Sequence, residues 1–162
     1  MNGSDSLKLV SSIVSCDRLR ELLHYEPKTG IFTWRRTGRI AGTEDANGYI
    51  KILVAGVRVQ AHALAWYYVH NELCFVDHKN RIKADNRLDN LRPANYQLNA
   101  ANRAYIGGNS GVKGVYKRGD KFETGIKVNQ KRIYLGRFNT LEEAAEAYKQ
   151  ASIEHFGEFA NV

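Results

Sequence analysis

The glycine-rich run GGNSG at residues 107–111 sets the first limit on what this chain of 162 residues can fold into. Uncharged runs of glycine, serine and asparagine join structural modules, because they have little to bury and no strongly preferred backbone conformation. The joint leaves residues 1–106 on one side and residues 112–162 on the other. Segments of these lengths form small domains, which excludes a large enzyme with a separate cofactor domain.

The charge balance favours a polyanionic partner. Lys and Arg number 24 against 17 Asp and Glu, which gives a formal net charge of +7. Nucleic acid is the first candidate and an anionic membrane surface the second. No apolar run approaches the roughly 18 to 20 residues that span a bilayer, so no membrane-spanning segment is expected. Of the two candidates we expect nucleic acid and no membrane partner. Cys16 and Cys74 lack the CxxC spacing of zinc sites and suit a reducing compartment.

Short strands and helices are predicted before the joint. Residues 1 to about 16 look like a loose lead, and Asp17 can cap a helix that runs to Tyr25. Apolar alternation and the Asn-Gly and Ala-Gly pairs then predict a series of β-hairpins. The expected strands are IFTW, YIKILV and VRVQ, and a helix is expected over 61–70.

The segment from 77 to 102 is unusually polar, with six asparagines among several arginines. Asp77 and His78 end a short apolar run, which places them at a strand terminus. Pro93 can occupy the first turn of a helix, on which Asn95, Asn99 and Asn102 would share one face. Such a cluster is a poor core and suits a site that handles a metal and phosphates.

A plainer interpretation exists for single members of this segment. Asx side chains bond their own backbone in turns, so Asn86 or Asn90 taken alone is most simply structural. His62 precedes an apolar helix, and a packing role is favoured there by about two to one.

The whole pattern, DHxNx(4)DNRxxNLRxxxxxxNxxN, resembles the HNH endonuclease family. It is similar to the subtype of phage and intron homing endonucleases in which the last position is asparagine. The similarity continues upstream through LLHYEPKTGIFTWRR, DANGYIKI and AHALAWYY, although Ala63 stands where relatives usually have arginine. The resemblance implies an endonuclease domain over 17–106, with a ββα-metal core at about 73–103.

The same resemblance implies a role for each motif residue. His78 would be the general base, and Asn90 would pin the loop between two strands and so orient the histidine. Asp77 and Asn99 would hold Mg²⁺ or Mn²⁺, the ions that oxygen ligands favour. No nucleotide cofactor is implied. Phosphates would be held by the two arginines of the motif, unless these are solvated surface charges: Arg87 and Arg92.

Beyond the joint, charges separate along the chain. Residues 112–137 hold eight Lys or Arg and two acidic residues, whereas residues 138–162 hold one Lys and five Glu. The basic stretch alternates as strands do, and Thr140-x-x-Glu143 is a capping box before an Ala-rich helix. This pattern predicts a three-stranded antiparallel sheet packed on one α-helix.

Strand periodicity gathers cationic and aromatic side chains on one face of that sheet. The face can lie against DNA, or it can be a solvated basic surface, with about even odds on periodicity alone. Its expected members are Tyr116, Arg118, Lys121, Glu123, Lys127, Arg132 and Tyr134. Phe122, Ile126 and Val128 would face the helix.

Almost the whole of residues 112–162 resembles the Apetala-two, or ethylene-response-factor, DNA-binding domain, including LGRFNTLEEAAEAY. Three positions depart from the family: Tyr116 replaces a usual arginine, Gly125 a usual glutamate, and Tyr134 a usual tryptophan. The positions that match family contacts with DNA are Lys113, Arg118, Lys127, Arg132 and Tyr134.

The resemblances together predict an α+β protein, with N-terminal β-hairpins and a ββα-metal unit followed by the sheet and helix. They imply a site-preferring endonuclease or nickase that acts on double-stranded DNA in the cytoplasm, in that of the host cell if the chain is phage-encoded. The alternative is a sequence-specific DNA-binding regulator with an inactive nuclease unit.

Overall fold

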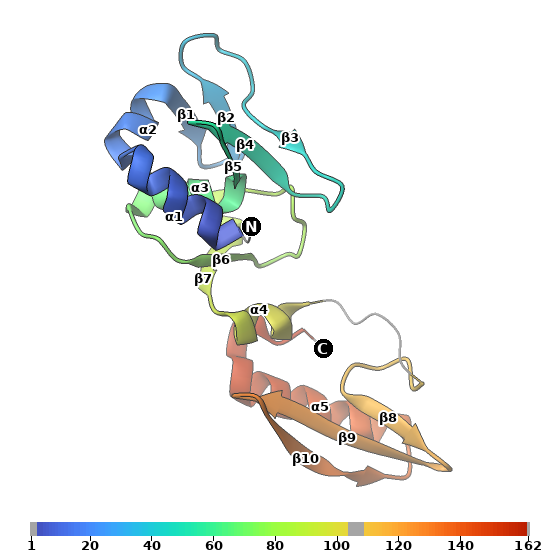
Figure 1. Cartoon of the computed structure of the whole chain (residues 1–162). Helices are drawn as coiled ribbons and strands as arrows, with labels where there is room; N and C mark the ends of the chain where they lie inside the picture. Colours follow the sequence, from blue (N-terminus) through green and yellow to red (C-terminus); the bar gives the residue numbers. More distant parts are fainter. Residues whose placement is uncertain (1–2, 104–108, 162) are drawn as a thin grey trace. The chain divides into compact units, whose positions relative to one another are not determined.

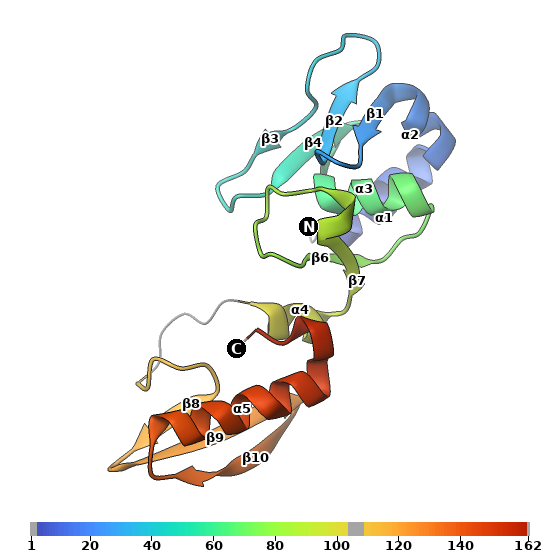
Figure 2. The same ribbon diagram turned by 180° about the vertical axis from the view of Figure 1, so that it is seen from behind.

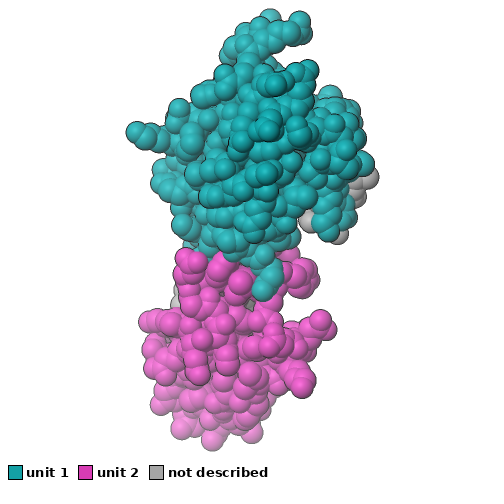
Figure 3. Space-filling model, turned by 90° about the vertical axis from the view of Figure 1, so that its left-hand side faces the viewer, with its two compact units in different colours: residues 1–95 teal, residues 96–162 magenta. Residues whose placement is uncertain are grey.

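The chain divides into two compact units, residues 1–95 and residues 96–162 (Figures 1 and 3). The computed structural model describes residues 3–103 and 109–161. Both units combine helices with small antiparallel sheets, so the α+β class is confirmed. The division precedes the helix α4 (Tyr96–Asn102), which belongs to the second unit. Of the expected joint, residues 107 and 108 lie outside the described residues.

Small antiparallel sheets and helices make up the first unit. Its sheets pair β1 with β2, then β3 with β4 and β5, then β6 with β7. The helices are α1 (Gly3–Ile13), α2 (Cys16–Leu22), α3 (Ala61–His70) and the 3₁₀ helix η1 (Leu88–Asn90). The strands are β1 (Leu23–Glu26), β2 (Ile31–Trp34), β3 (Thr43–Glu44), β4 (Ile50–Val54), β5 (Val57–Gln60), β6 (Phe75–His78) and β7 (Leu91–Ala94). The hairpins and the helix over 61–70 are therefore confirmed.

The expectation of a loose lead is wrong, because α1 packs against β5 and α3. Leu7, Val10 and Val14 are buried in the core of the first unit. They follow one another at intervals of three and four residues, which is one face of a helix. Serines between them hide this spacing in the sequence.

Helix α2 begins one residue before the expected Asp17, and its N-cap is Ser15, whose hydroxyl accepts from the Arg18 N–H. It ends at Leu22, and the next residues, expected to be helical, form β1. Leu23 and Tyr25 are buried on either side of an exposed residue, which is the two-residue period of a strand. Pairing with β2 therefore overrides the helical spacing of the leucines.

Helix α3 is the centre of the first unit and contacts α1, α2, β4, β5 and β6. Beside it, β6 pairs with β7, with Asp77 opposite Arg92 and His78 opposite Leu91. Pro93 lies within β7 and not in the first turn of a helix, so that expectation is wrong. A two-stranded sheet has only edge strands, where the missing N–H of proline is tolerated.

In the second unit, β8 (Val115–Arg118), β9 (Lys121–Val128) and β10 (Lys131–Phe138) form an antiparallel sheet in the order β10-β9-β8. Helix α5 (Leu141–Phe156) packs on one face of it, as the view from behind shows (Figure 2), and the 3₁₀ helix η2 (Gly157–Phe159) follows. Thr140 and Glu143 form the predicted capping box. The expected sheet and helix are confirmed. No helix in residues 3–103 and 109–161 is long and apolar enough to cross a bilayer.

Candidate functional site

The candidate site of the first unit lies at the end of β6, where Asp77 and His78 are both buried. Successive side chains of a strand point to opposite faces, so the two residues meet different neighbours. The Asp77 carboxylate meets the guanidinium of Arg92 across the hairpin, and the His78 ring meets Asn86 and His62. The end of one strand thus carries an acid and an imidazole in fixed surroundings.

Asn86 holds the His78 ring. Its Oδ1 lies 3.0 Å from His78 Nε2, and its Nδ2 donates to the Ala84 carbonyl at 3.3 Å. Because Oδ1 can only accept, Nε2 carries the proton and donates it to Asn86. In a neutral imidazole the lone pair then resides on Nδ1. The amide selects the tautomer in which Nδ1 can accept a proton.

The loop between β6 and η1 is fastened from within by Asn90. Its Oδ1 accepts from the Asn80 N–H at 3.0 Å, and its Nδ2 donates to the Asp85 carbonyl at 2.7 Å. Asn90 therefore bonds to both sides of the loop, while the contact with the histidine is made by Asn86. The sequence predicted that Asn90 pins the loop and so orients the histidine. In the structure Asn90 fixes the loop, and Asn86 makes the direct contact with the His78 ring.

The same loop is fastened from outside by the β1–β2 hairpin. The Tyr25 hydroxyl donates to the Asn86 carbonyl at 2.7 Å, and the Leu88 N–H donates to the Pro27 carbonyl at 3.0 Å. Gly30, with φ of +74°, lies so close that a Cβ there would collide with the backbone of Asn86. Only glycine combines this backbone angle with such a close approach.

His62 lies beside His78 and completes a group of three rings with Tyr49. The ring centroids of His62 and His78 are 4.7 Å apart, and that of Tyr49 is 5.5 Å from His62. His62 is 6% exposed, and its Nδ1 has no hydrogen-bond partner among the described residues. The helix α3 thus places a second imidazole directly against the candidate base.

Burial keeps both imidazoles neutral. It lowers the pKa of His62 to about 3, helped by the neighbouring His78. Burial also lowers the pKa of His78, and the hydrogen bond with Asn86 and the charges of Asp77 and Asp85 partly oppose this effect. Removing water disfavours the charged form of a histidine. At neutral pH His78 is therefore in the form that accepts a proton.

The two arginines of the motif have different positions. Arg92 is buried, and its Nη2 lies 3.2 Å from Asp77 Oδ2 in an ion pair, while its contact with a phosphate stays a prediction. Arg87 is exposed and bonds Asp85 through Nε at 2.8 Å and Nη2 at 2.7 Å. This pairing lowers the pKa of Asp85 to about 2.

The loop itself is basic on its outer side. Four cations and one carboxylate lie between residues 79 and 87, and all four cations are exposed. They are Lys79, Arg81, Lys83 and Arg87. A phosphate brought near His78 would meet this excess of positive charge.

Asn99, the second expected metal ligand, lies on α4 in the second unit. It stands outside the group that the first unit brings together, which consists of Asp77, His78 and Asn90. Among the residues that the structure describes, no group of three or more His, Cys, Asp or Glu could hold a metal ion. Asp77 is the one predicted ligand in the first unit.

In the second unit, the expected polar face exists. The register places Tyr116 opposite Glu123, Arg118 opposite Lys121, and Tyr134 opposite Gly125, and directly paired residues share a face. Arg132 pairs with Lys127 and Arg137 with Glu123, which adds to the same face. The face opposite to it contributes the buried Val115, Thr124 and Ile126.

Lys113 is not part of this face. Its ammonium donates to the carbonyls of Ala101 at 2.5 Å, Arg103 at 3.0 Å and Asn161 at 3.2 Å. An ammonium has three protons, and three carbonyls use them. Lys113 therefore has a structural role at the end of α4, and its contact with DNA stays a prediction.

The sequence prediction missed two residues of the site. Asn86 sits in an Asp-Asn-Arg turn, and turn chemistry explains it fully until its contact with His78 is known. His62 has no polar cluster near it in the sequence, and its one signal is a histidine within an apolar helix. Neither role can be read from the sequence, because each depends on a contact with His78 that only the fold creates.

Comparison of the chain with models of protein families, with curated proteins and with solved structures finds no match.

Replacing His62 tests whether its buried ring is neutral in the folded chain. The unfolded chain binds a proton at this histidine below its ordinary pKa near 6.5, whereas the folded chain does so only near 3. Stability is therefore complete above pH 6.5 and falls as the pH is lowered toward 3. We expect His62→Phe to flatten the dependence of unfolding free energy on pH between 4 and 6 by about 1.4 kcal/mol per pH unit.

Urea unfolding of both proteins across this pH range measures the difference. His24→Phe, at an exposed position of β1, is the matched control and should keep the wild-type slope. Equal slopes for the wild type and His62→Phe would show that His62 is protonated in the folded chain.

Proposed function

We propose that the chain is a metal-dependent, site-preferring endonuclease or nickase of the HNH type that hydrolyses phosphodiester bonds of double-stranded DNA in the cytoplasm. The observation that carries the proposal is the bond between His78 Nε2 and Asn86 Oδ1, which leaves a neutral imidazole with its lone pair on Nδ1. The exposed cations of the 79–87 loop and the ordered polar pattern of residues 77–102 support it.

Hydrolysis requires a base for the attacking water, and His78 supplies it. Its Nδ1 takes a proton from the water as the water oxygen forms a bond with phosphorus and the bond from phosphorus to the 3′ oxygen breaks. The leaving 3′ oxygen takes its proton from solvent water. The Nε2–H of His78 stays hydrogen-bonded to Asn86 Oδ1 while the imidazolium forms. Asn90 keeps the loop, and hence Asn86, in place during this step.

The donor chemistry of the site suits a hard divalent cation. Asp77 supplies a carboxylate, and Mg²⁺ commonly uses one or two carboxylates and completes its shell with water and phosphate oxygens. When bound, Mg²⁺ or Mn²⁺ would neutralise charge that develops on the phosphate oxygens. The ion pair with Arg92 holds the Asp77 side chain in place. The assignment of Asn99 as a second ligand stays a prediction from the sequence.

The polar face of the second unit is proposed to bind the duplex. Helix α5 covers the other face and carries four of the acidic residues, so positive charge is left on the exposed side of the sheet. Sheets and ribbons with exposed cations bind DNA through phosphates and base edges. The proposed contacts are Tyr116, Arg118, Lys121, Lys127, Arg132, Tyr134 and Arg137, together with Arg87 of the first unit.

Removing the proposed base should abolish most of the chemistry. We expect His78→Ala to nick supercoiled plasmid at least about 100-fold more slowly in Mg²⁺, since a positioned general base contributes about that much. Its affinity for duplex DNA, measured in chelator, should change by less than about twofold. His24→Ala, an exposed histidine on β1, is the control.

Nicking by His78→Ala near the wild-type rate would remove this residue from the mechanism. Duplex binding without nicking by the wild type, in either Mg²⁺ or Mn²⁺, would instead favour a DNA-binding regulator with an inactive nuclease unit.

The metal assignment is best tested with Asp77→Asn. Alanine at this position would remove the buried carboxylate that faces the Arg92 guanidinium, which costs about 3 to 5 kcal/mol and confuses folding with chemistry. The amide keeps an oxygen acceptor for Arg92 and loses the charge that attracts a cation. A titration of the nicking rate with Mg²⁺ should show a higher half-saturating concentration, at least about tenfold.

Asp17→Asn removes one carboxylate from an exposed position of α2 and should keep the wild-type titration. An unchanged Mg²⁺ dependence in Asp77→Asn would place the ion elsewhere. Asn99→Ala, assayed in the same way, tests the ligand predicted from the sequence.

Charge on the sheet face should set the salt dependence of binding. Each phosphate that a cation neutralises contributes about 0.9 to the slope of log affinity against log salt concentration. We expect the triple variant Arg118→Gln, Lys121→Gln, Arg137→Gln to flatten this slope by roughly 2 to 3. Fluorescence anisotropy of a labelled duplex with the full chain, in chelator so that the DNA stays intact, measures it.

Lys149→Gln, at an exposed position of α5, is the control for loss of a cation from the second unit. A triple variant with the wild-type slope would show that the phosphates are bound elsewhere.

A further inference from the structure

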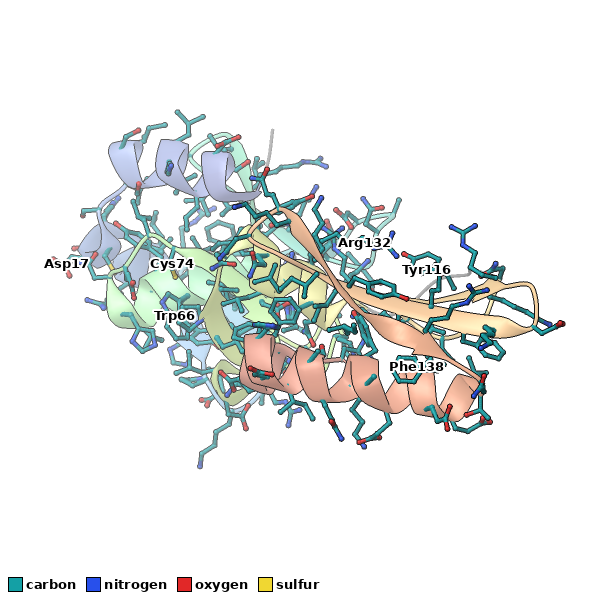
Figure 4. The ribbon with its side chains drawn as sticks, turned by 90° about the horizontal axis from the view of Figure 1, so that it is seen from below. Asp17, Trp66, Cys74, Tyr116, Arg132 and Phe138 are labelled. Atoms are coloured by element: carbon teal, nitrogen blue, oxygen red, sulfur yellow. The ribbon has the colours of Figure 1, made fainter. Side chains whose placement is uncertain are left out.

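Arg132 crosses the polar face of the sheet and lies on a tyrosine two strands away. It belongs to β10, and its guanidinium carbon is 4.9 Å from the centroid of the Tyr116 ring on β8. Figure 4 labels both residues on the side of the sheet away from α5. A guanidinium above an aromatic ring is attracted by the negative charge of the ring face. The side chain must pass over β9 to reach it.

Gly125 provides this passage. A Cβ at residue 125 would lie 3.0 Å from Arg132 Nε and 3.0 Å from the Ile133 carbonyl oxygen. Both distances are shorter than ordinary van der Waals contact, so a Cβ at this position would require Arg132 Nε or the Ile133 carbonyl oxygen to move by a few tenths of an ångström. The backbone of residue 125 has no left-handed angle that would itself require glycine. The close approach of Arg132 is what the glycine permits.

The other arginines of the face are held more loosely. Arg118 Nε is 3.9 Å and Arg137 Nε 4.0 Å from the Glu123 carboxylate, and their side chains are 65% and 52% exposed. These distances exceed hydrogen-bond length, so the ion pairs with Glu123 constrain both side chains only weakly. A side chain already ordered in the free protein loses less conformational freedom on binding. Arg132 is therefore prepared for a contact of defined geometry.

Resting on the proposed binding of duplex DNA, we propose that Gly125, Tyr116 and Arg132 form the base-reading element of this sheet. Arg132 donates two hydrogen bonds to O6 and N7 of one guanine in the major groove, the pattern that a planar guanidinium matches. Arg118 and Arg137 bind phosphates, for which a mobile cation is sufficient. Tyr116 and Gly125 are positioning residues, because they act through Arg132.

Two measurements on the full-length chain test this division. Selection of duplexes from a pool with a randomised central segment, in chelator, gives the base preference of each variant. We expect the wild type to select guanine at one position, and Gly125→Ala, Tyr116→Leu and Arg132→Lys to lose that preference by about 5- to 150-fold. Arg118→Lys and Arg137→Lys should retain it. Affinity for unselected duplex should change by less than about threefold in Gly125→Ala, which replaces none of the proposed DNA contacts.

The second measurement needs no DNA. In the free protein, the Arg132 Nε–Hε resonance should be shifted by the Tyr116 ring current, and the shift should vanish in Tyr116→Leu and in Gly125→Ala while thermal unfolding of both variants stays cooperative. Tyr116→Phe keeps the ring and should keep both the shift and the preference.

A guanine preference that survives Gly125→Ala and Tyr116→Leu overturns the base-reading element alone, as does an equal loss of preference in Arg137→Lys. Absence of duplex binding by the wild type overturns the proposed DNA-binding function and the recognition by Arg132 with it.

Discussion

The fastening of the loop between β6 and η1 is the constraint on which the first unit's site depends. Asn90 bonds to both sides of this loop, and Tyr25 and Gly30 hold it from outside. Asn86 then has one position, and through it His78 has one tautomer. Buried polar groups that satisfy one another are stabilising and specific as a set, because each would be costly if left alone.

The chemistry of the site follows from its place beside a hydrophobic core. Helix α3 contributes largely buried alanine and leucine side chains to that core and presses His62 against His78 at the end of β6. The packing that fixes the imidazole also excludes water, which keeps the ring neutral. Position and proton affinity are therefore set by the same contacts. The Asp77–Arg92 pair does the same for the carboxylate on the other side of the strand.

The second unit separates its two tasks by the alternation of its strands. Apolar residues face α5 and supply stability, and the opposite face is free for cations and tyrosines. In the described part of the chain no helix packs on that face, so a side chain is not needed at every position to fill a core. Gly125 leaves room there for Arg132 to reach Tyr116. Lys113 belongs to the same basic stretch but has a structural role, because its ammonium donates hydrogen bonds to three backbone carbonyls.

The sequence by itself determined what depends on short-range periodicity: the hairpins of the first unit, the helix over 61–70, the capped helix α5, the polar face of the three-stranded sheet, and Asp77 and His78 at a strand end. Only the tertiary structure decided the burial of α1, the strand position of Pro93 and the use made of Asn86, His62, Arg92 and Lys113. These features share one physical reason. Each is fixed by a partner on another element, and local propensity carries no information about which partner a side chain will meet.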